Sequence, residues 1–306
     1  MRVFLTGASG HIGSALIPEL ITAGHSVVGL ARSDDAAALV AERGAEVVRG
    51  GLDDLDVLRA ATSDSDGVIH LAFRHDLMQV GDMAGAADSD LAALTAIGDA
   101  VRGTGKALVG TSGTLLLAAS GITGRPGTEE DALPSGYRID SENFVIGLAD
   151  DDVRSSVVRL PPTVHSDLDR HGFVPGLIGF ARNAGSSGYL GDGHNRWPAV
   201  HTRDAARVYR RALESAPAGT RLHAVAEEGV PFREIAAAIG RGLDIPVVSV
   251  PKDPVPKDRA ADVFGYLAGF VGIDNPTSST LTRELLDWEP EFPGLLSDLA
   301  AGHYFT

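Results

Sequence analysis

The chain has 306 residues, 44% hydrophobic and 22% charged, which fits a globular protein of two domains, or of one large domain with an added lobe. Its net charge of -15 argues against nucleic-acid binding, and no apolar run approaches the ~20 residues that cross a bilayer, so we expect neither nucleic acid nor membrane as a partner. The absence of cysteine excludes disulfides and thiolate nucleophiles, and the ten histidines show no ligand spacing, so we expect no metal.

The first predicted elements are a strand, a glycine turn and a helix. Apolar residues 3–5 are followed directly by Thr-Gly-Ala-Ser-Gly-His-Ile-Gly at 6–13, and apolar residues at helical spacing come next. Gly7 lets the chain turn sharply, Gly10 lets backbone approach a pyrophosphate, and Gly13 lets the helix pack close to the sheet. Unpaired N–H groups at the start of the helix would hold the phosphates. The residues that we expect around the phosphates are Gly7, Ser9, Gly10, His11, Ile12 and Gly13.

Short β-rich runs recur along the chain, with helical or polar segments between them. They lie at residues 2–6, 26–30, 45–48, 67–72, 106–111, 155–160 and 221–226. This alternation predicts an α/β fold with a doubly wound parallel sheet of the Rossmann type. Since no leader pattern precedes the first strand, we expect a cytoplasmic protein.

Other elements are predicted between and after these strands. The stretch 84–105 predicts a helix that ends at Gly103, and Pro18 should kink or restart the first helix. The later patterns predict helices at 205–213 and 232–239, a strand at 247–250 and a loop at 251–256.

The composition changes after residue 160. Pro161-Pro162 and repeated glycines up to residue 193 predict a lid or lobe added to the core fold. We therefore divide the chain into a dinucleotide-binding Rossmann domain and a smaller, mainly C-terminal substrate-binding lobe. The first comprises residues 1–162 and 200–227, and the second comprises residues 163–199 and 228–306.

The end of the second strand indicates which nicotinamide dinucleotide binds. An NAD site needs a carboxylate there, about 20 residues past the glycines, to hold the ribose 2′-hydroxyl. Here Arg32 offers a guanidinium suited to a 2′-phosphate, Ser33 offers a further donor, and the carboxylates at 34–35 come too late. We expect NADP(H) in preference to NAD(H); the alternative is that Arg32 is a solvated strand end.

Several landmarks resemble the extended short-chain dehydrogenase/reductase superfamily, and more narrowly its atypical members. They are the glycine turn, Leu52-Asp53 after the third strand, His70-Leu71-Ala72 at the end of the fourth, residues 200–206, and residues 286–290. The resemblance implies that Asp53 accepts a hydrogen bond from the adenine amino group and that Leu71-Ala72 line the nicotinamide-side ribose. It also implies a homodimer. The alternative for Asp53 is a helix cap.

The catalytic pair of that superfamily, Tyr-x-x-x-Lys, is broken here. Tyr137 is followed four positions later by Ser141; alternatively, aligning Glu142 with the family's glutamate puts Pro134 at the tyrosine position and Arg138 at the lysine position. An unassisted phenol titrates near ~10, so Tyr137 can donate a proton but is a poor base at neutral pH. Arg138 would replace the lysine by charge only. Reduction is therefore the easier direction.

Other candidates for the site follow the fifth and sixth strands. Ser112 or Thr114 would hold the substrate oxygen, or their hydroxyls simply satisfy the strand end. His165, just past a Pro161-Pro162 step expected to face the nicotinamide, is a second candidate acid or a structural histidine. Trp197 resembles the wall of the family's substrate cleft, or belongs to the core. The assignments are, for catalysis, Ser112, Tyr137 and Arg138; for the cofactor also Thr111 and Pro161; for substrate, Thr114, His165 and Trp197.

Three functions remain open at this point. The leading one is an NADPH-dependent reductase of a small carbonyl or related unsaturated substrate. A nucleotide-sugar epimerase or dehydratase would need bound NAD and a tyrosinate base, and both Arg32 and the missing lysine argue against it. A noncatalytic NADP sensor would bind the dinucleotide without turnover.

Overall fold

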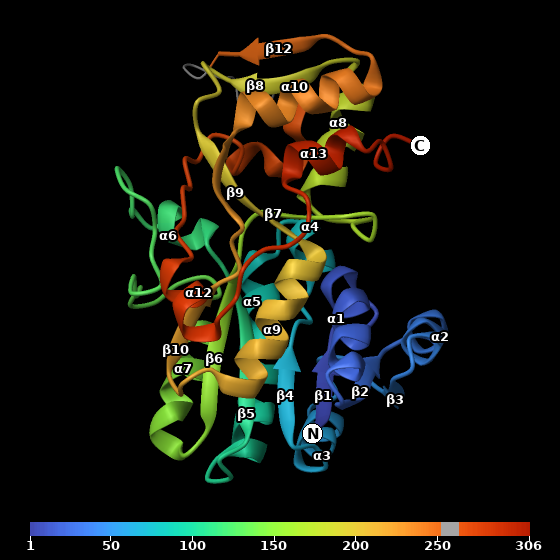
Figure 1. Cartoon of the computed structure of the whole chain (residues 1–306), viewed down its shortest axis with the longest axis vertical. Helices are drawn as coiled ribbons and strands as arrows, with labels where there is room; N and C mark the ends of the chain where they lie inside the picture. The colour runs from blue at the N-terminus through green and yellow to red at the C-terminus, as the bar shows by residue number, and fades with distance from the viewer. Residues whose placement is uncertain (252–262) are drawn as a thin grey trace.

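A seven-stranded parallel sheet forms the centre of the larger part of the molecule, with strand order β10-β6-β5-β4-β1-β2-β3 (Figure 1). The computed structural model describes residues 1–251 and 263–306. The strands of this sheet are β1 (Arg2–Thr6), β2 (Ser26–Ala31), β3 (Glu46–Arg49), β4 (Gly67–His70), β5 (Ala107–Gly113), β6 (Arg154–Leu160) and β10 (Thr220–His223). The fold is therefore the doubly wound α/β fold that the sequence predicts.

Helices cover both faces of the sheet, and the strands are apolar because they are buried on both sides. One face carries α1 (His11–Thr22) and α9 (Thr202–Ser215), which pack against each other. The other carries α3 (Leu55–Ser63), α5 (Met83–Val101) and α7 (Ile139–Gly147). The remaining helices of this part are α2 (Asp34–Glu42), α4 (His75–Gln79), α6 (Leu115–Ala119) and the 3-10 helix η1 (Leu148–Asp151).

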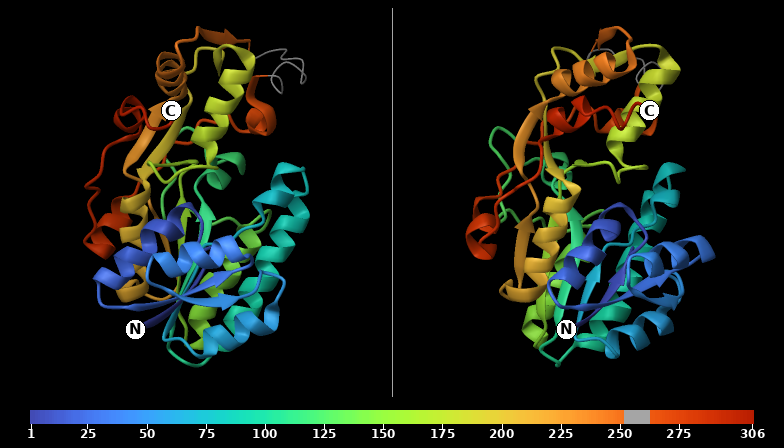
Figure 2. Two further views of the ribbon diagram at one scale, coloured as in Figure 1. Left: turned by 90° about the vertical axis from the view of Figure 1, so that its right-hand side faces the viewer. Right: turned by 45° about the vertical axis from the view of Figure 1, so that its right-hand side comes forward.

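A smaller lobe lies beyond the carboxyl ends of the parallel strands (Figures 1 and 2). It has its own hydrophobic core, centred on Trp197, Phe232 and Phe264. Its strands are β7 (Thr163–His165), β8 (Ser187–Leu190), β9 (Arg196–His201), β11 (Glu227–Pro231) and β12 (Val247–Val250). Its helices are α8 (Phe173–Ala184), α10 (Phe232–Leu243), η2 (Gly265–Gly269) and α13 (Leu295–Ala300). Helix α12 (Thr280–Leu286) instead packs beside α9 and β10 of the larger part (Figure 1).

Some expected boundaries were wrong. β4 ends at His70 instead of residue 72, β10 ends at His223 instead of residue 226, and α5 ends at Val101 instead of Gly103. Helix α1 continues through Pro18 without restarting, because this proline is exposed and only one helical hydrogen bond is lost there. Apart from Pro251, the loop predicted at 251–256 lies outside the described residues.

None of the helices within residues 1–251 and 263–306 combines the length and the apolar composition that a membrane span requires.

Candidate dinucleotide and substrate site

The glycine turn between β1 and α1 leaves no room for side chains at two positions. Gly7 has a φ of 68°, and an ideal Cβ there would lie 2.8 Å from the backbone nitrogen of Ala72. A Cβ at Gly13 would lie 2.3 Å from the carbonyl oxygen of Gly7. Gly10 donates its N–H to that same oxygen at 3.0 Å, which closes the turn. Gly7 and Gly13 are therefore required by the backbone path itself.

The start of α1 is open to a ligand. Its N-cap residue is Gly10, and no side chain caps the helix. The first N–H groups of the helix, which include those of His11 and Ile12, therefore have no helical acceptor and are available to phosphate oxygens. Ser9 is half-buried in the same turn. This uncapped helix start and the glycine cradle fit a dinucleotide diphosphate.

Two arginines, Arg32 and Arg49, come close to the start of α2 along the chain or in space, and the sequence did not indicate the second of them. Arg32 is exposed, and the hydroxyl of Ser33 accepts the N–H of Ala36 as the N-cap of α2. Arg49, at the end of β3, donates to the carbonyl oxygen of Ser33 at 2.6 Å and to a carboxylate oxygen of Asp34 at 2.8 Å. Arg49 was missed because only the pairing of β2 with β3 brings it there.

Asp53 faces the same end of the sheet. Asp54, and not Asp53, occupies the N-cap position of α3, so the helix-cap alternative for Asp53 does not apply. The carboxylate of Asp53 accepts from Arg74 at 3.2 Å and from Ser89 at 3.3 Å, and it stays 76% exposed. Leu52 beside it is buried.

A buried polar chain fixes the turn after β4, where Leu71 and Ala72 lie against Gly7. The hydroxyl of Thr6 accepts the N–H of Ala72 at 3.2 Å and contacts Nδ1 of His70 at 3.0 Å. Nε2 of His70 lies 3.3 Å from a carboxylate oxygen of Asp90. Burial by itself would raise the pKa of Asp90, but Arg138 and His70 lower it below its ordinary value.

Tyr137 and Arg138 lie at the carboxyl end of the sheet, against a phenylalanine that the sequence did not indicate. The guanidinium of Arg138 stacks 4.0 Å over the ring of Phe73, and the ring of Tyr137 meets the same ring edge-on at 6.2 Å. Arg138 donates to the carbonyl oxygen of Thr111 at 2.9 Å, and its Nε lies 3.9 Å from Asp90. The positively charged guanidinium of Arg138 and the phenol of Tyr137 therefore lie against the same ring.

The phenol of Tyr137 is suited to give a proton and not to take one. Burial raises the pKa of Tyr137, and the nearby positive charge of Arg138 opposes this only in part. The phenol oxygen is buried and has no hydrogen-bond partner among the described residues. This hydroxyl makes no hydrogen bond to the described residues, so its hydrogen is free to be donated to a substrate oxygen.

Glu142 lies in α7 and is the residue on which the second sequence alignment depends. It holds this helix in place. Its carboxylate accepts from Nε of Arg159 at 3.0 Å and from Nε of Arg221 at 2.7 Å, and it is 4% exposed. These bonds fix α7 against β6 and β10. Arg138 comes one turn before Glu142, so it holds the place that the second alignment gives to the lysine.

The hydroxyl side chains at the end of β5 and directly after it are buried. Thr111 donates to the carbonyl oxygen of His70 at 2.7 Å and contacts the hydroxyl of Tyr209 at 2.8 Å. Thr114 accepts from Asn275 at 3.1 Å, and Ser112 is 2% exposed. Pro161, at the end of β6, is buried as well.

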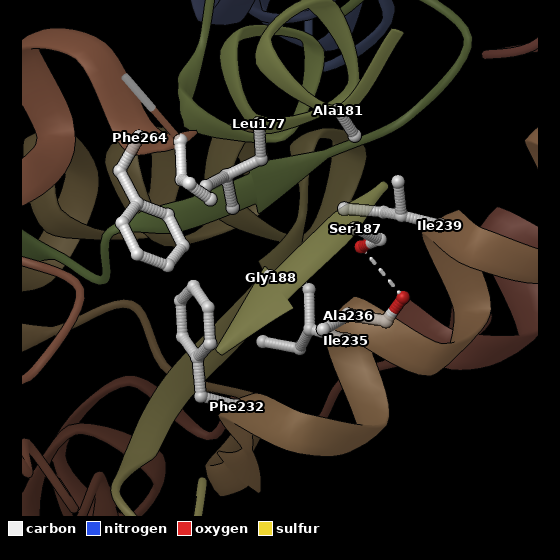
Figure 3. Close-up of a pocket in the computed structure, with 10 residues that line it drawn as sticks. Leu177, Ala181, Ser187, Gly188, Phe232, Ile235, Ala236, Ile239 and Phe264 are labelled. Atoms are coloured by element: carbon white, nitrogen blue, oxygen red, sulfur yellow. Dashed lines mark hydrogen bonds between the residues drawn. The ribbon is translucent and has the colours of Figure 1, made fainter. Parts of the chain in front are cut away.

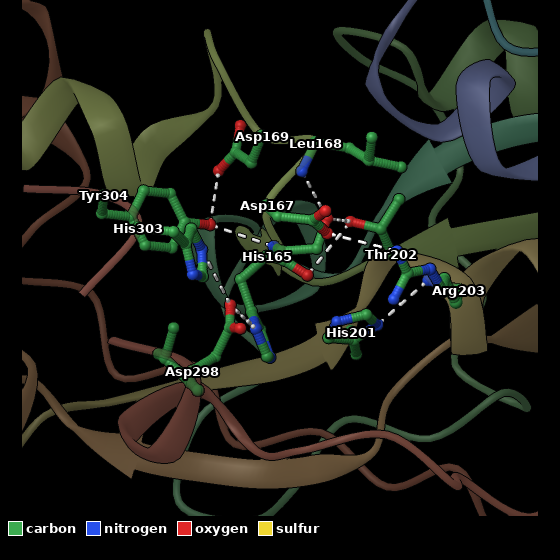
Figure 4. Close-up of polar contacts among 12 residues, drawn as sticks. His165, Asp167, Leu168, Asp169, His201, Thr202, Arg203, Asp298, His303 and Tyr304 are labelled. Atoms are coloured by element: carbon green, nitrogen blue, oxygen red, sulfur yellow. Dashed lines mark hydrogen bonds and ion pairs between the residues drawn. The ribbon is translucent and has the colours of Figure 1, made fainter. Parts of the chain in front are cut away.

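His165 and Trp197 have no exposed surface, so a substrate contact at either would require neighbouring side chains to move. Trp197 packs in the lobe core, with its ring 4.9 Å from that of Phe232. Nδ1 of His165 lies 2.9 Å from the carboxylate of Asp298 (Figure 4). His201 is the N-cap residue of α9, and its Nδ1 accepts the N–H of Arg203 at 3.2 Å.

The lobe also contains a small internal pocket (Figure 3). Apolar side chains from α8, α10 and the segment before η2 line it, and Ser187 donates to the carbonyl oxygen of Ala236 at its edge. Its volume of about 10 Å³ admits no more than one water molecule. It is a packing defect of the lobe and not a substrate site.

The fold and the glycine turn define the class of protein, a Rossmann-fold protein of the extended short-chain dehydrogenase/reductase type. The model of the NAD dependent epimerase/dehydratase family matches residues 3–225, and the chain belongs to this family. It is 45% identical over 305 residues to an uncharacterized protein of Schizosaccharomyces pombe, with 100% of both chains covered. It is 31% identical over 267 residues to the 2'-dehydrokanamycin reductase of Streptomyces kanamyceticus. This alignment covers 83% of this chain and 70% of that protein.

Among solved structures, the dTDP-glucose 4,6-dehydratase DesIV of Streptomyces venezuelae, with NAD and TYD bound, superposes with a TM-score of 0.77. The alignment covers 100% of this chain and 96% of DesIV, at 18% sequence identity. At this identity the likeness establishes the fold.

Proposed function

We propose that this protein is an NADP(H)-dependent oxidoreductase that reduces a small carbonyl compound or a related unsaturated substrate. The observation that carries the proposal is the buried, unpartnered phenol of Tyr137, whose raised pKa keeps it protonated at neutral pH. Reduction needs a proton donor at the substrate oxygen, whereas alcohol oxidation and epimerisation need a base there. The likeness to the 2'-dehydrokanamycin reductase, at 31% identity, supports the same direction.

Each part of the site has a role in this proposal. Bound NADPH supplies the hydride. The glycine turn holds the diphosphate, and the smaller lobe covers the substrate. Tyr137 gives its proton to the substrate oxygen, while Arg138 stabilises the negative charge that develops there. Phe73 fixes the guanidinium from below.

Replacing Tyr137 with phenylalanine is expected to lower kcat for carbonyl reduction by about 10²- to 10⁴-fold, the usual contribution of a positioned proton donor. The dissociation constant for NADPH should stay unchanged, because the phenol does not face the phosphates. NADPH oxidation with a panel of aldehydes, ketones and enones measures the first quantity, and fluorescence titration measures the second. Tyr189→Phe, on β8 of the lobe, is the matched control. Full activity of Tyr137→Phe would exclude this donor.

The preference for NADP(H) is proposed to depend on Arg32 and Arg49 together. Each charge-assisted hydrogen bond to the 2′-phosphate contributes roughly 1.5–3 kcal/mol. We therefore expect Arg32→Ala to weaken NADPH binding by about 10- to 100-fold and to leave NADH binding unchanged. Arg49→Ala should act in the same direction, whereas Arg43→Ala, at the far end of α2, should not. An Arg32→Ala protein that still prefers NADPH contradicts the assignment.

A nucleotide-sugar epimerase or dehydratase is the second candidate, because the family model that matches the chain is named for these activities. It requires Tyr137 to act as a base. Conversion of a nucleotide sugar without net consumption of NADPH would favour it over reduction. The homodimer and the cytoplasmic location expected from the sequence stay predictions.

A further inference from the structure

A second polar cluster lies between the start of α1 and the lobe. Figure 4 shows the part of this cluster around Thr202, Asp169 and Tyr304. His11, the first residue of α1, contacts the hydroxyl of Thr202 through Nε2, and its Nδ1 lies 3.6 Å from a carboxylate oxygen of Asp169. Asp169 precedes α8 and is 3% exposed. The cluster therefore joins the glycine turn to the part of the chain that forms the lobe.

The hydrogen bonds around Thr202 determine where the proton of His11 resides. Thr202 donates its single hydroxyl hydrogen to the carbonyl oxygen of His165 at 3.0 Å, and it accepts from Ser166 at 2.8 Å. It has no second hydrogen to give, so His11 must donate from Nε2. In the neutral ring, Nδ1 then carries no hydrogen and presents a lone pair to Asp169.

The carboxylate of Asp169 likewise has no hydrogen-bond donor on the side that faces Nδ1 of His11. It accepts the N–H of Gly172 at 2.8 Å and the hydroxyl of Tyr304 at 3.3 Å, and Tyr304 in turn accepts the N–H of Ser166 at 3.0 Å. At 3.6 Å, a bare imidazole nitrogen and a carboxylate oxygen repel each other unless one proton lies between them.

The titration of the two groups is consistent with an unfilled proton site at neutral pH. Burial lowers the pKa of His11 to about 4 and raises the pKa of Asp169 to about 6. Above pH 6, therefore, neither member of the pair holds the shared proton in most molecules.

Other charges face this pair from every side. Among them, His165 and His201 disfavour a positive charge on His11, whereas Asp167 favours it. His165 also faces Asp169 and is itself held by Asp298, which lies 3.8 Å from His303.

We propose that His11 and Asp169 form a proton-binding pair that takes up a proton when a dinucleotide diphosphate binds at the start of α1. This inference rests on the dinucleotide binding proposed above. The negative charge of the diphosphate next to His11 favours the protonated pair, and the shared proton turns a repulsive contact into an ion pair. Asp169 thereby acts as a positioning residue, because the same carboxylate holds the start of α8 and Tyr304. Cofactor binding and the attachment of the lobe are thus coupled.

The direct test is calorimetric titration with NADP⁺ and with NAD⁺ at pH 7 in buffers of different ionisation enthalpy, which gives the number of protons taken up. We expect net uptake by the wild-type protein, and a dissociation constant that rises with pH between 6 and 8 by up to about tenfold per unit, the limit for one linked proton. NAD⁺ has no 2′-phosphate that could itself titrate, so any proton taken up when NAD⁺ binds is taken up by the protein.

The decisive variant is Asp169→Asn, which keeps the size of the side chain and removes the titrating group. We expect it to lose the proton uptake and to flatten the pH profile. His11→Gln, which can still donate to Thr202, should do the same and serves as the second variant if Asp169→Asn does not fold. Asp167→Asn is the matched control, since Asp167 lies on the exposed side of the cluster and pairs with Arg203.

The outcomes separate this inference from the proposed function. Uptake in the wild-type protein that disappears in both variants and persists in Asp167→Asn supports the proton-binding pair. Dinucleotide binding without uptake, or with the same uptake in Asp169→Asn and His11→Gln, overturns it while leaving the dinucleotide site in place. Absence of any dinucleotide binding overturns both.

Discussion

Replacing Gly13 with alanine is expected to abolish measurable dinucleotide binding and to destabilise the protein by about 1–3 kcal/mol, the usual cost of overpacking. The added Cβ would meet three backbone atoms at 2.3, 2.7 and 2.8 Å, and all three belong to Gly7 and Ala8. Backbone cannot swing away as a side chain can, so α1 must move off the turn. The N–H groups that would hold the diphosphate move with it. Calorimetric titration and thermal unfolding measure the two effects.

The matched control for this substitution is Gly179→Ala. Gly179 lies inside α8, and an ideal Cβ there meets nothing within 4 Å. Alanine is a better helix former than glycine, so this variant should be slightly more stable than the wild-type protein and bind dinucleotide equally well. Equal binding by Gly13→Ala and Gly179→Ala would show that the turn does not hold the ligand.

The second large effect is expected at Glu142, where glutamine should destabilise the protein by about 3–5 kcal/mol. Glutamine has nearly the same shape but leaves the guanidinium of Arg159, which is 1% exposed, without its counter-charge. Arg221 loses the same partner. We expect the thermal midpoint to fall by about 10 °C. Glu46→Gln, which breaks the exposed pair with Arg2 on the sheet edge, is the control and should change the midpoint little.

The loss of stability caused by Glu142→Gln should depend on pH. Burial alone would raise the pKa of Glu142, but its bonds to Arg159 and Arg221 leave it below the ordinary value of 4.5. A carboxylate whose pKa is lowered on folding stabilises the protein above its unfolded pKa and loses this contribution as pH falls through the folded pKa. The difference in the free energy of unfolding between the wild-type protein and Glu142→Gln should therefore be full at neutral pH and become smaller below about pH 4.5. A difference that is constant down to pH 3 contradicts the ion-pair explanation.

Most of the fold could be predicted from local sequence patterns. The glycine turn and the seven parallel strands follow from residue order alone, because each strand is a short apolar run and each crossover needs a helix. The errors in the prediction lie at the ends of helices and strands, because tertiary contacts determine where an element stops. β4, for instance, stops at His70 because Leu71 and Ala72 turn to pack against Gly7.

The candidate site could be predicted only in part. The residues that we propose around the phosphates form a continuous motif, so the sequence indicates them directly. Phe73, Arg49 and Asp169 carry no such signal, because their partners are distant in the chain and only the folded sheet and lobe bring them together. A histidine after the second glycine was the one visible hint of the cluster around Asp169. Trp197 could not be assigned to the core or the cleft from sequence, since an aromatic residue suits both.

Calorimetric titration of the wild-type protein with NADPH and with NADH tests the central claim most directly. We expect saturable binding of both dinucleotides at one site per chain, with NADPH bound at least about tenfold more tightly because of the hydrogen bonds that we propose between its extra phosphate and Arg32 and Arg49. Tighter binding of NADH would contradict the assignment of the adenosine end. Failure of either compound to bind would contradict the whole site.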